Sequence, residues 1–388
     1  MTSQSPDTVE ALLQRMVSFN TVNSAISGIP DAEVELSDYL EAQAGMMGLK
    51  TQRLPVSGRS YNLLVSHRPD DAAPWLLFES HLDTVSVKGM TVDPFAGAIE
   101  GNRLYGRGAC DTKGTGAAML WALKQCIEEE SAAGNIAILF TVDEEITKTG
   151  VRTFTRDHLP ALGWRPQGAI VGEPTRLQLI VAHNGVVRWR ISTRGLAAHS
   201  SNPSEGRSAI SAMVKVVDAL ESSYIPALTA QHPLTGTARC SVNMIAGGVQ
   251  INIIPEHCEI HVDRRLVPGE APEEVLPAVQ VVLDELCGRD ATLEVTQQEP
   301  DMLDHPLDPA GGEDFTGRVG AALESQGLSG RALGVGYGTD GSTLSIAGIP
   351  VVVLGPGDIA QAHTHNEWIE LDDLRLGVEV YATLMTSL

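Results

Sequence analysis

Short runs of apolar residues recur along the chain, and several of them lead into an acidic or imidazole side chain. Four such runs predict buried strands, at residues 75–80, 136–142, 169–172 and 350–354. The side chains that follow are His81, the acidic residues 143–145, Glu173 and, some way further on, His363, whereas Asp111 opens a predicted helix. In open α/β sheets the carboxyl ends of strands and the starts of the following helices line one crevice. These polar side chains are therefore expected to converge.

Helical and strand patterns alternate through roughly the first 180 residues. Residues 8–19 place an apolar face after a predicted Asp7 cap, and residues 33–47 and 112–126 predict two further helices. Residues 62–66 predict a strand, and the Gly-punctuated segment 97–105 predicts a hairpin. The repetition of strand and helix predicts an α/β domain with a mainly parallel sheet flanked by helices.

The pattern then changes to strand, helix, strand, strand, helix, strand, at residues 186–193, 208–222, 239–245, 259–266, 271–286 and 291–296. That order predicts a ferredoxin-like β-α-β-β-α-β domain. An α/β pattern returns at residues 313–325, 346–354 and 371–384. Because His363 lies in this last part, we expect a catalytic domain in two parts, 1–182 and 297–388, with residues 183–296 inserted as a lid or dimerisation domain.

Composition excludes several classes of function. The chain has 388 residues, 43% of them hydrophobic, so it can bury a substantial core and is expected to form two domains. Its net charge of −22 and pI near 4.8 argue against binding to nucleic acid or to an anionic membrane. Five cysteines without CxxC spacing, no signal-like amino terminus and no apolar stretch of about 20 residues predict a cytoplasmic protein with reduced thiols.

The candidate ligands come with neighbours that suit a metal site. In HLD, residues 81–83, the Asp83 carboxylate can hold the far ring N–H of His81. Asp111, in the glycine-rich GRGACDTKG segment, is interpreted as a carboxylate that bridges two cations, or as a helix cap, or as both. That segment lacks the GxxxxGK[ST] order of a phosphate-binding loop.

The remaining candidates leave alternatives open. The three acidic residues of DEE, 143–145, repel one another unless a cation, hydrogen bonds or solvent neutralise their charges. One of the two glutamates can bind a metal ion while the other accepts a proton from water. Either His363 or His365 can serve as a ligand in AHTHNE. A late GxGxxG match at residues 336–341 does not suit dinucleotide binding, and no GxSxG serine elbow is present.

Together, the motifs resemble those of the dizinc metallopeptidases and aminoacylases, the family of acetylornithine deacetylase, succinyl-diaminopimelate desuccinylase and carboxypeptidase G. The resemblance covers nearly the whole chain and rests on HLD, GRGACDTKG, DEE, GEPT (172–175), GLAAHSS (195–201) and AHTHNE (362–367). The acetylornithine deacetylase branch is the most similar. However, Asn184 stands where that branch usually has lysine, and Ser342 stands where desuccinylases usually have arginine.

The resemblance implies a role for each site residue. Asp111 would bridge two Zn²⁺ ions, for which Co²⁺ or Mn²⁺ could substitute, with His81 and Glu173 on one ion and Glu145 and His363 on the other. Glu144 would be the general base, Asp83 would orient His81, and His199 would polarise the scissile carbonyl across a homodimer interface formed by the inserted domain. Four residues would contact the substrate: Asn252, Arg265, Gly338 and Thr339.

The expected activity is therefore hydrolysis of the amide bond of an N-acyl amino acid by metal-activated water, as in acetylornithine deacetylase. The alternatives are a desuccinylase-like deacylase, or a dipeptidase, carboxypeptidase or aminopeptidase that uses the same metal pair. A non-enzymatic metal-binding module is disfavoured because every proposed ligand and the base are present.

Overall fold

The computed structural model describes residues 6–388, and these form two compact units. The first contains the described residues up to Val181 together with Pro309–Leu333 and Thr339–Leu388, and the second contains Ala182–Asp308 and Gly334–Gly338. The second unit ends after Asp308 rather than at residue 296, because β17 (Met302–Asp304) pairs with β9 (Gly185–Arg194) of that unit. The first five residues, on which part of the signal-peptide prediction depends, lie outside the described residues.

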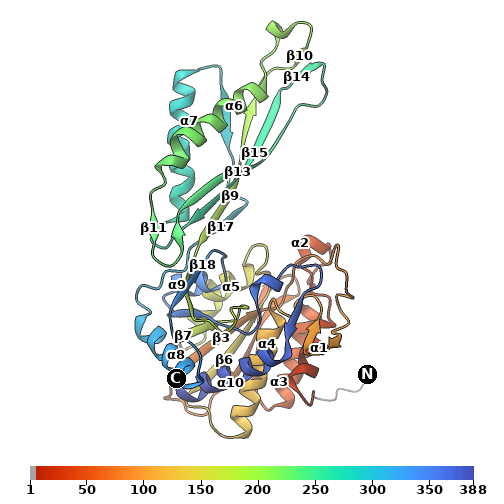
Figure 1. The fold of residues 1–388 in the computed structure, drawn as a ribbon, viewed down its shortest axis with the longest axis vertical. Helices are drawn as coiled ribbons and strands as arrows, with labels where there is room; N and C mark the ends of the chain where they lie inside the picture. Colours follow the sequence, from red (N-terminus) through yellow and green to blue (C-terminus); the bar gives the residue numbers. More distant parts are fainter. Residues whose placement is uncertain (1–5) are drawn as a thin grey trace. The chain divides into compact units, whose positions relative to one another are not determined.

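The first unit is built on an eight-stranded sheet (Figure 1). Its strands in spatial order are β1 (Lys50–Ser57), β2 (Ser60–His67), β6 (Asn135–Thr141), β3 (Trp75–His81), β7 (Pro166–Val171), β19 (Val351–Val353), β8 (Ile180–His183) and β18 (Leu333–Val335). The last two residues of β8 and of β18 fall in the second unit. The four central strands from β6 to β19 are parallel, whereas β1, β2 and β8 pair antiparallel with their neighbours. The predicted mainly parallel sheet is therefore confirmed for its centre.

The apolar runs follow from burial on both faces of this sheet. Every residue of β3 and β6 is buried, as expected for parallel strands covered by helices. Neighbouring residues of β3 point to opposite faces. Phe78 packs edge-on against Tyr381 of α10 (Leu371–Ser387), while Glu79 accepts a hydrogen bond from Thr141 Oγ, which also contacts Asp340 just before α9 (Gly341–Ile346).

Six other α-helices are described in the first unit: α1 (Val9–Val17), α2 (Ser24–Ser27), α3 (Val34–Met46), α4 (Lys113–Glu128), α5 (Thr149–Thr153) and α8 (Glu313–Ser325). Helix α4 packs against β3 and β6, and α10 lies along α4. The cap of α1 is Thr8, whose side chain accepts a hydrogen bond from Ala11 N, so the predicted Asp7 cap is wrong. The expected strand at 346–354 is shortened to Val351–Val353 because Ile346 ends α9 and Gly348 turns the chain with a φ of 78°.

A small three-stranded sheet joins two segments that are distant in sequence. Its strands are β4 (Ile99–Glu100), β5 (Arg103–Tyr105) and β20 (Trp368–Glu370). Strands β4 and β5 form the predicted hairpin, and β20 pairs antiparallel with β5. The chain that leads into Asp111 therefore lies beside the chain that leaves His363.

The longer elements of the second unit, leaving out its two-residue strands, follow the order β9, α6 (Ala209–Ala219), β13 (Arg239–Gly247), β15 (His257–Leu266), α7 (Val275–Arg289) and β16 (Glu294–Gln297). Its main sheet has the strand order β13-β15-β9-β16, with each neighbouring pair antiparallel. Helices α6 and α7 contact each other and share an apolar core with the sheet, in which Trp189, Met213 and Ile260 are buried. A short pairing of β10 (Ala198–His199) with β14 (Ile253–Ile254) lies outside this sheet.

Candidate metal centre

The five predicted ligands come from different elements of the first unit and meet at one end of its sheet. His81 is the last residue of β3, while Glu145 and Glu173 follow β6 and β7, the two neighbours of β3. Asp111 precedes α4, and His363 lies between β19 and β20. Because β6, β3 and β7 are parallel, their carboxyl ends lie at the same edge, which explains why residues so far apart in sequence converge.

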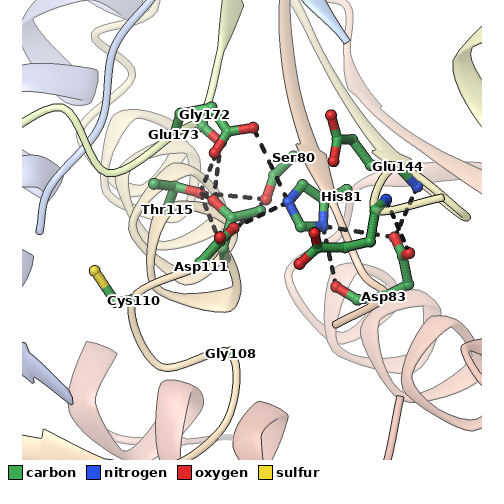
Figure 2. Close-up of polar contacts among 12 residues, drawn as sticks. Ser80, His81, Asp83, Gly108, Cys110, Asp111, Thr115, Glu144, Gly172 and Glu173 are labelled. Carbon is green, nitrogen blue, oxygen red and sulfur yellow. Dashed lines mark hydrogen bonds and ion pairs between the residues drawn. The ribbon is translucent and has the colours of Figure 1, made fainter. Parts of the chain in front are cut away.

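The carboxylate of Asp111 lies between the two imidazoles. Its Oδ1 is 3.2 Å from His81 Nε2, and its Oδ2 is 3.2 Å from His363 Nε2. Glu145 Oε1 is also 3.2 Å from His363 Nε2, and Glu173 Oε1 is 4.0 Å from His81 Nε2. Figure 2 shows the His81 ring with Asp111 and Glu173 on one side and Asp83 on the other. The two oxygens of Asp111 therefore face different partners.

This spacing fits a site for a divalent cation. Zinc lies about 2.0–2.2 Å from nitrogen and oxygen ligands, so neighbouring ligand atoms in a tetrahedral site are roughly 3.3 Å apart. Donor atoms of His81, Asp111 and Glu145 all lie within 4.8 Å of one another. Imidazole nitrogens and carboxylate oxygens are ordinary zinc ligands. The donor set and its separations therefore suit metal binding.

The electrostatics of the cluster also favour bound cations. Burial, together with the Asp111 carboxylate, raises the pKa of Glu145 to about 7 and raises that of Glu173 well above its ordinary value. Hydrogen bonds to Asp111 and Glu145 raise the pKa of His363 to about 10. Burial thus disfavours the charged form of Glu145 and Glu173 and favours protons or other positive charge beside them. A divalent cation would replace those protons.

Asp83 organises the loop after β6 as well as the ring of His81. Its Oδ1 accepts a hydrogen bond from Glu144 N at 2.9 Å, and its Oδ2 accepts from Glu145 N at 3.2 Å and from Asn23 Nδ2 at 2.8 Å. His81 Nδ1 is 3.0 Å from the backbone carbonyl of Asp83 and 3.5 Å from the carboxylate. The nearer contact to the imidazole is therefore the main chain of Asp83 rather than its side chain.

Glu144 lies beside the cluster and has a cationic neighbour. It is buried, and its Oε1 is 3.4 Å from Lys148 Nζ, which is also buried. Burial raises the pKa of Glu144, and Lys148 acts in the opposite direction. The preceding Asp143 has a left-handed backbone with a φ of 63°, an uncommon conformation for a residue with a side chain. This turn sends Glu144 and Glu145 to different neighbours.

Three details differ from the sequence-based expectations or complete them. Asp111 does not open α4, because the helix begins at Lys113 with Thr112 as its N-cap. His363 is the histidine in contact with the acids, while the exposed His365 lies beside Gly89. Asn23 was not predicted as part of the site. It is the N-cap of α2, a position where asparagine is common, and its Oδ1 accepts from Ala25 N.

The other predicted residues are distributed over both units. In the second unit, His199 is exposed on β10 with its Nδ1 2.7 Å from Ser201 Oγ, and the amide of Ser200 donates to Asn252 O at 3.0 Å. Arg265 lies on β15 and donates from Nε to Asp263 Oδ1 at 2.7 Å, and Gly338 belongs to the same unit. Thr339 belongs to the first unit, where it is fully buried.

The chain is similar to known hydrolases along nearly its whole length. Acetylornithine deacetylase of Myxococcus xanthus is 30% identical over 352 residues, which cover 88% of each chain. A relative from Aspergillus clavatus, described as a probable carboxypeptidase, is 27% identical and covers 95% of this chain and 88% of its own. The M20 family metallo-carboxypeptidase of Sulfolobus solfataricus has the same fold, with a TM-score of 0.79 at 17% identity over 98% of this chain and 99% of that one.

The family assignment agrees with the resemblance noted from the motifs. The model of peptidase family M20/M25/M40 matches residues 77–387, a range that contains all five candidate ligands as well as Asp83 and Glu144. Among the described residues, no helix is both long and apolar enough to cross a bilayer. The chain is a metal-dependent hydrolase that belongs to peptidase family M20/M25/M40.

Proposed function

We propose that this hydrolase removes the acyl group from an N-acyl amino acid, as acetylornithine deacetylase does, and that it uses two Zn²⁺ ions. The observation that carries the proposal is the placement of Asp111, whose two oxygens each lie 3.2 Å from a different imidazole. A carboxylate shared in this way suits two cations better than one. The acetylornithine deacetylase of Myxococcus xanthus supports the choice of substrate class.

The ligands divide into two groups around Asp111. We assign His81 and Glu173 to one ion and Glu145 and His363 to the other, with Asp111 shared by both; Co²⁺ or Mn²⁺ could substitute for zinc. When bound, the metal pair would polarise the scissile carbonyl and lower the pKa of a water molecule from about 15.7 toward roughly 7. The residues of the chain supply the orientation of these ligands and the proton transfers.

Glu144 is assigned the role of general base. Its carboxylate would take a proton from the attacking water and return it to the leaving nitrogen. Its raised pKa, caused by burial, makes it a better proton acceptor than an exposed glutamate. Lys148, 3.4 Å away, can hold the side chain in place without blocking both of its oxygens. Asp83 would hold the backbone amides of Glu144 and Glu145 in position.

The second unit is assigned the role of a ferredoxin-like lid and dimerisation domain. Its β-α-β-β-α-β order and antiparallel sheet support the description. Strand β13 is an edge strand with Met244 and Ile245 61% and 58% exposed, and such an edge readily pairs with a second chain. Ile245→Asp should therefore convert a homodimer to a monomer in light scattering, whereas a wild-type monomer would contradict the proposal.

The substrate contacts are proposed by likeness. His199 would polarise the scissile carbonyl across the dimer interface, a contribution of about 3 kcal/mol when a single donor is removed. Arg265 would bind the substrate carboxylate, since a guanidinium matches its planar geometry. Asn252, Gly338 and Thr339 would line the pocket. The five cysteines are all unpaired, which supports a reducing cytoplasmic location.

A carboxypeptidase that uses the same centre is the second candidate, supported by the relative from Aspergillus clavatus. The two candidates differ in the group that carries the scissile carbonyl, which is a simple acyl group for the deacylase and an amino-acid residue for the carboxypeptidase. Purified protein loaded with Zn²⁺ or Co²⁺ should be assayed with N-acetylornithine, N-succinyl-diaminopimelate, and dipeptides that are free or blocked at the amino end. Faster turnover of the acylated amino acids supports the deacylase, faster turnover of peptides supports the carboxypeptidase, and no hydrolysis of any of them refutes both.

A further inference from the structure

A buried ion pair that the proposed chemistry does not use contacts the loop that carries Asp111. Arg107 and Glu367 have side chains only 3% and 0% exposed, and Arg107 Nη1 donates to Glu367 Oε2 at 2.6 Å. Buried ion pairs are weak evidence for stability, since the cost of desolvation offsets much of the attraction. The arrangement of their other hydrogen bonds indicates a more specific role.

Glu367 accepts hydrogen bonds from the loop that carries Asp111. Its Oε1 accepts from Cys110 N and Asp111 N, both at 2.9 Å, and its Oε2 accepts from Gly108 N at 3.1 Å in addition to Arg107. Each carboxylate oxygen therefore has two donors. The Glu367 side chain thus fixes the backbone of Asp111, the proposed bridging ligand. In the same loop Gly108 has a φ of 83°, a conformation that favours glycine.

Arg107 ties the same loop to the segment that carries His363. Its Nη2 donates to Thr364 O at 3.2 Å and to Ser86 O at 2.9 Å, while Gly106 N donates to Glu367 O at 3.0 Å. Thr364 directly follows His363, whose own backbone is left-handed with a φ of 60°. The two loops are therefore held together by contacts that run in both directions.

His363 depends on this attachment more than His81 does. The side chain of His363 is 51% exposed, whereas that of His81 is 2% exposed and belongs to a fully buried strand. Packing thus fixes His81, but the position of His363 relative to Asp111 is set mainly by its loop. Any loosening of that loop should act first on the ion shared by Asp111, Glu145 and His363.

We propose that Glu367, through its pair with Arg107, is a positioning residue that holds Asp111 and His363 at the separation required for the second metal ion. The inference rests on the proposed two-ion centre. It predicts that changing the pair weakens one of the two binding steps selectively, by about 10- to 100-fold, as partners of metal ligands commonly do. A merely structural pair would lower the stability of the protein with and without metal alike.

The test uses full-length protein stripped of metal and titrated with Co²⁺, followed by calorimetry and by the visible absorption of bound cobalt. Glu367→Gln places an amide group among N–H donors and leaves Arg107 without its counter-charge. Arg107→Lys retains the charge pair and the backbone contacts of Glu367, but it loses the fork that reaches Thr364 and Ser86. In both variants we expect one Co²⁺ to bind as in the wild type and the other to bind about 10- to 100-fold more weakly.

The matched control is Glu270→Gln in the second unit. Glu270 pairs with Arg264, whose side chain is 3% exposed, and accepts from Val267 N at 2.9 Å. This control should lower the unfolding temperature but leave both cobalt steps unchanged. If Glu367→Gln fails to fold, Arg107→Lys decides the question: two wild-type binding steps in that variant overturn the positioning role. If the wild-type protein itself binds fewer than two ions, the proposed two-ion centre fails instead.

Discussion

The substitution Asp83→Asn tests how the acidic loop after β6 is held. Asparagine retains one acceptor oxygen, which can still accept from Glu144 N, but it puts an amide group where Oδ2 accepts from Asn23 and Glu145 N. Asn23 cannot relieve the clash by flipping its own amide. Its Oδ1 accepts from Ala25 N at 2.9 Å, and its Nδ2 also donates to Asp143 Oδ1 at 2.8 Å. The hydrogen bonds at Oδ2 are thus lost.

The magnitude follows from those two bonds. Hydrogen bonds to a charged group contribute about 1.5–3 kcal/mol each, so the variant should lose about 3 kcal/mol or more of stability. Displacement of the Glu145 backbone should also weaken metal binding by about 10- to 100-fold. A tenfold change corresponds to about 1.4 kcal/mol, so weaker binding should add to the loss of stability in the metal-bound protein. Displacement of Glu144 should lower kcat as well.

Three measurements check this prediction: urea unfolding of the metal-free protein, metal titration, and kcat and KM at saturating metal. We expect kcat to fall even when metal binding is saturated, because Glu144 is displaced together with Glu145. Asp38→Asn is a suitable control, since Asp38 is 46% exposed and accepts from Tyr61 OH, remote in its contacts from the metal ligands. A kcat within twofold of the wild type in Asp83→Asn would refute the reasoning.

Three further predictions concern the base, the metal and a buried acid. Glu144→Ala should retain the metal content measured by atomic emission but lose about 10²- to 10⁴-fold in kcat, and unchanged turnover would exclude it as the base. Chelation should abolish hydrolysis, and zinc at 100 times its Kd should add about 2.7 kcal/mol to the free energy of unfolding; equal stability with and without zinc would argue against a metal site. Burial and the Asp83 carboxylate raise the pKa of Glu33 to about 7 from 4.5. The folded state therefore binds more protons than the unfolded state between these values, and stability falls as pH rises through this window. Glu33→Gln should remove that fall and increase the free energy of unfolding at pH 8, by about 3 kcal/mol at most, but not at pH 4.5; an equal effect at both pH values would contradict it.

Much of the fold could be predicted because buried elements have recognisable patterns of apolar residues in the sequence. Strands β3 and β6 are buried at every position, so they appear as continuous apolar runs, and the residues after them mark the edge of the sheet. Strand β17 is too short to show such a pattern. It has three residues, and its assignment to the second unit depends on pairing with β9, more than 100 residues earlier in the chain.

The sequence by itself determined which residues stand at the ends of strands, and the motifs indicated which of them could bind metal. Only the tertiary structure decided that Asp111 Oδ1 faces His81 while Oδ2 faces His363, and that Glu144 lies beside Lys148. It alone brought Asn23 to Asp83 and Arg107 to Glu367, pairs separated by 60 and 260 residues. The physical reason is that hydrophobic periodicity records which face of an element is buried, whereas contacts between loops depend on the order of the strands and on how each loop leaves them.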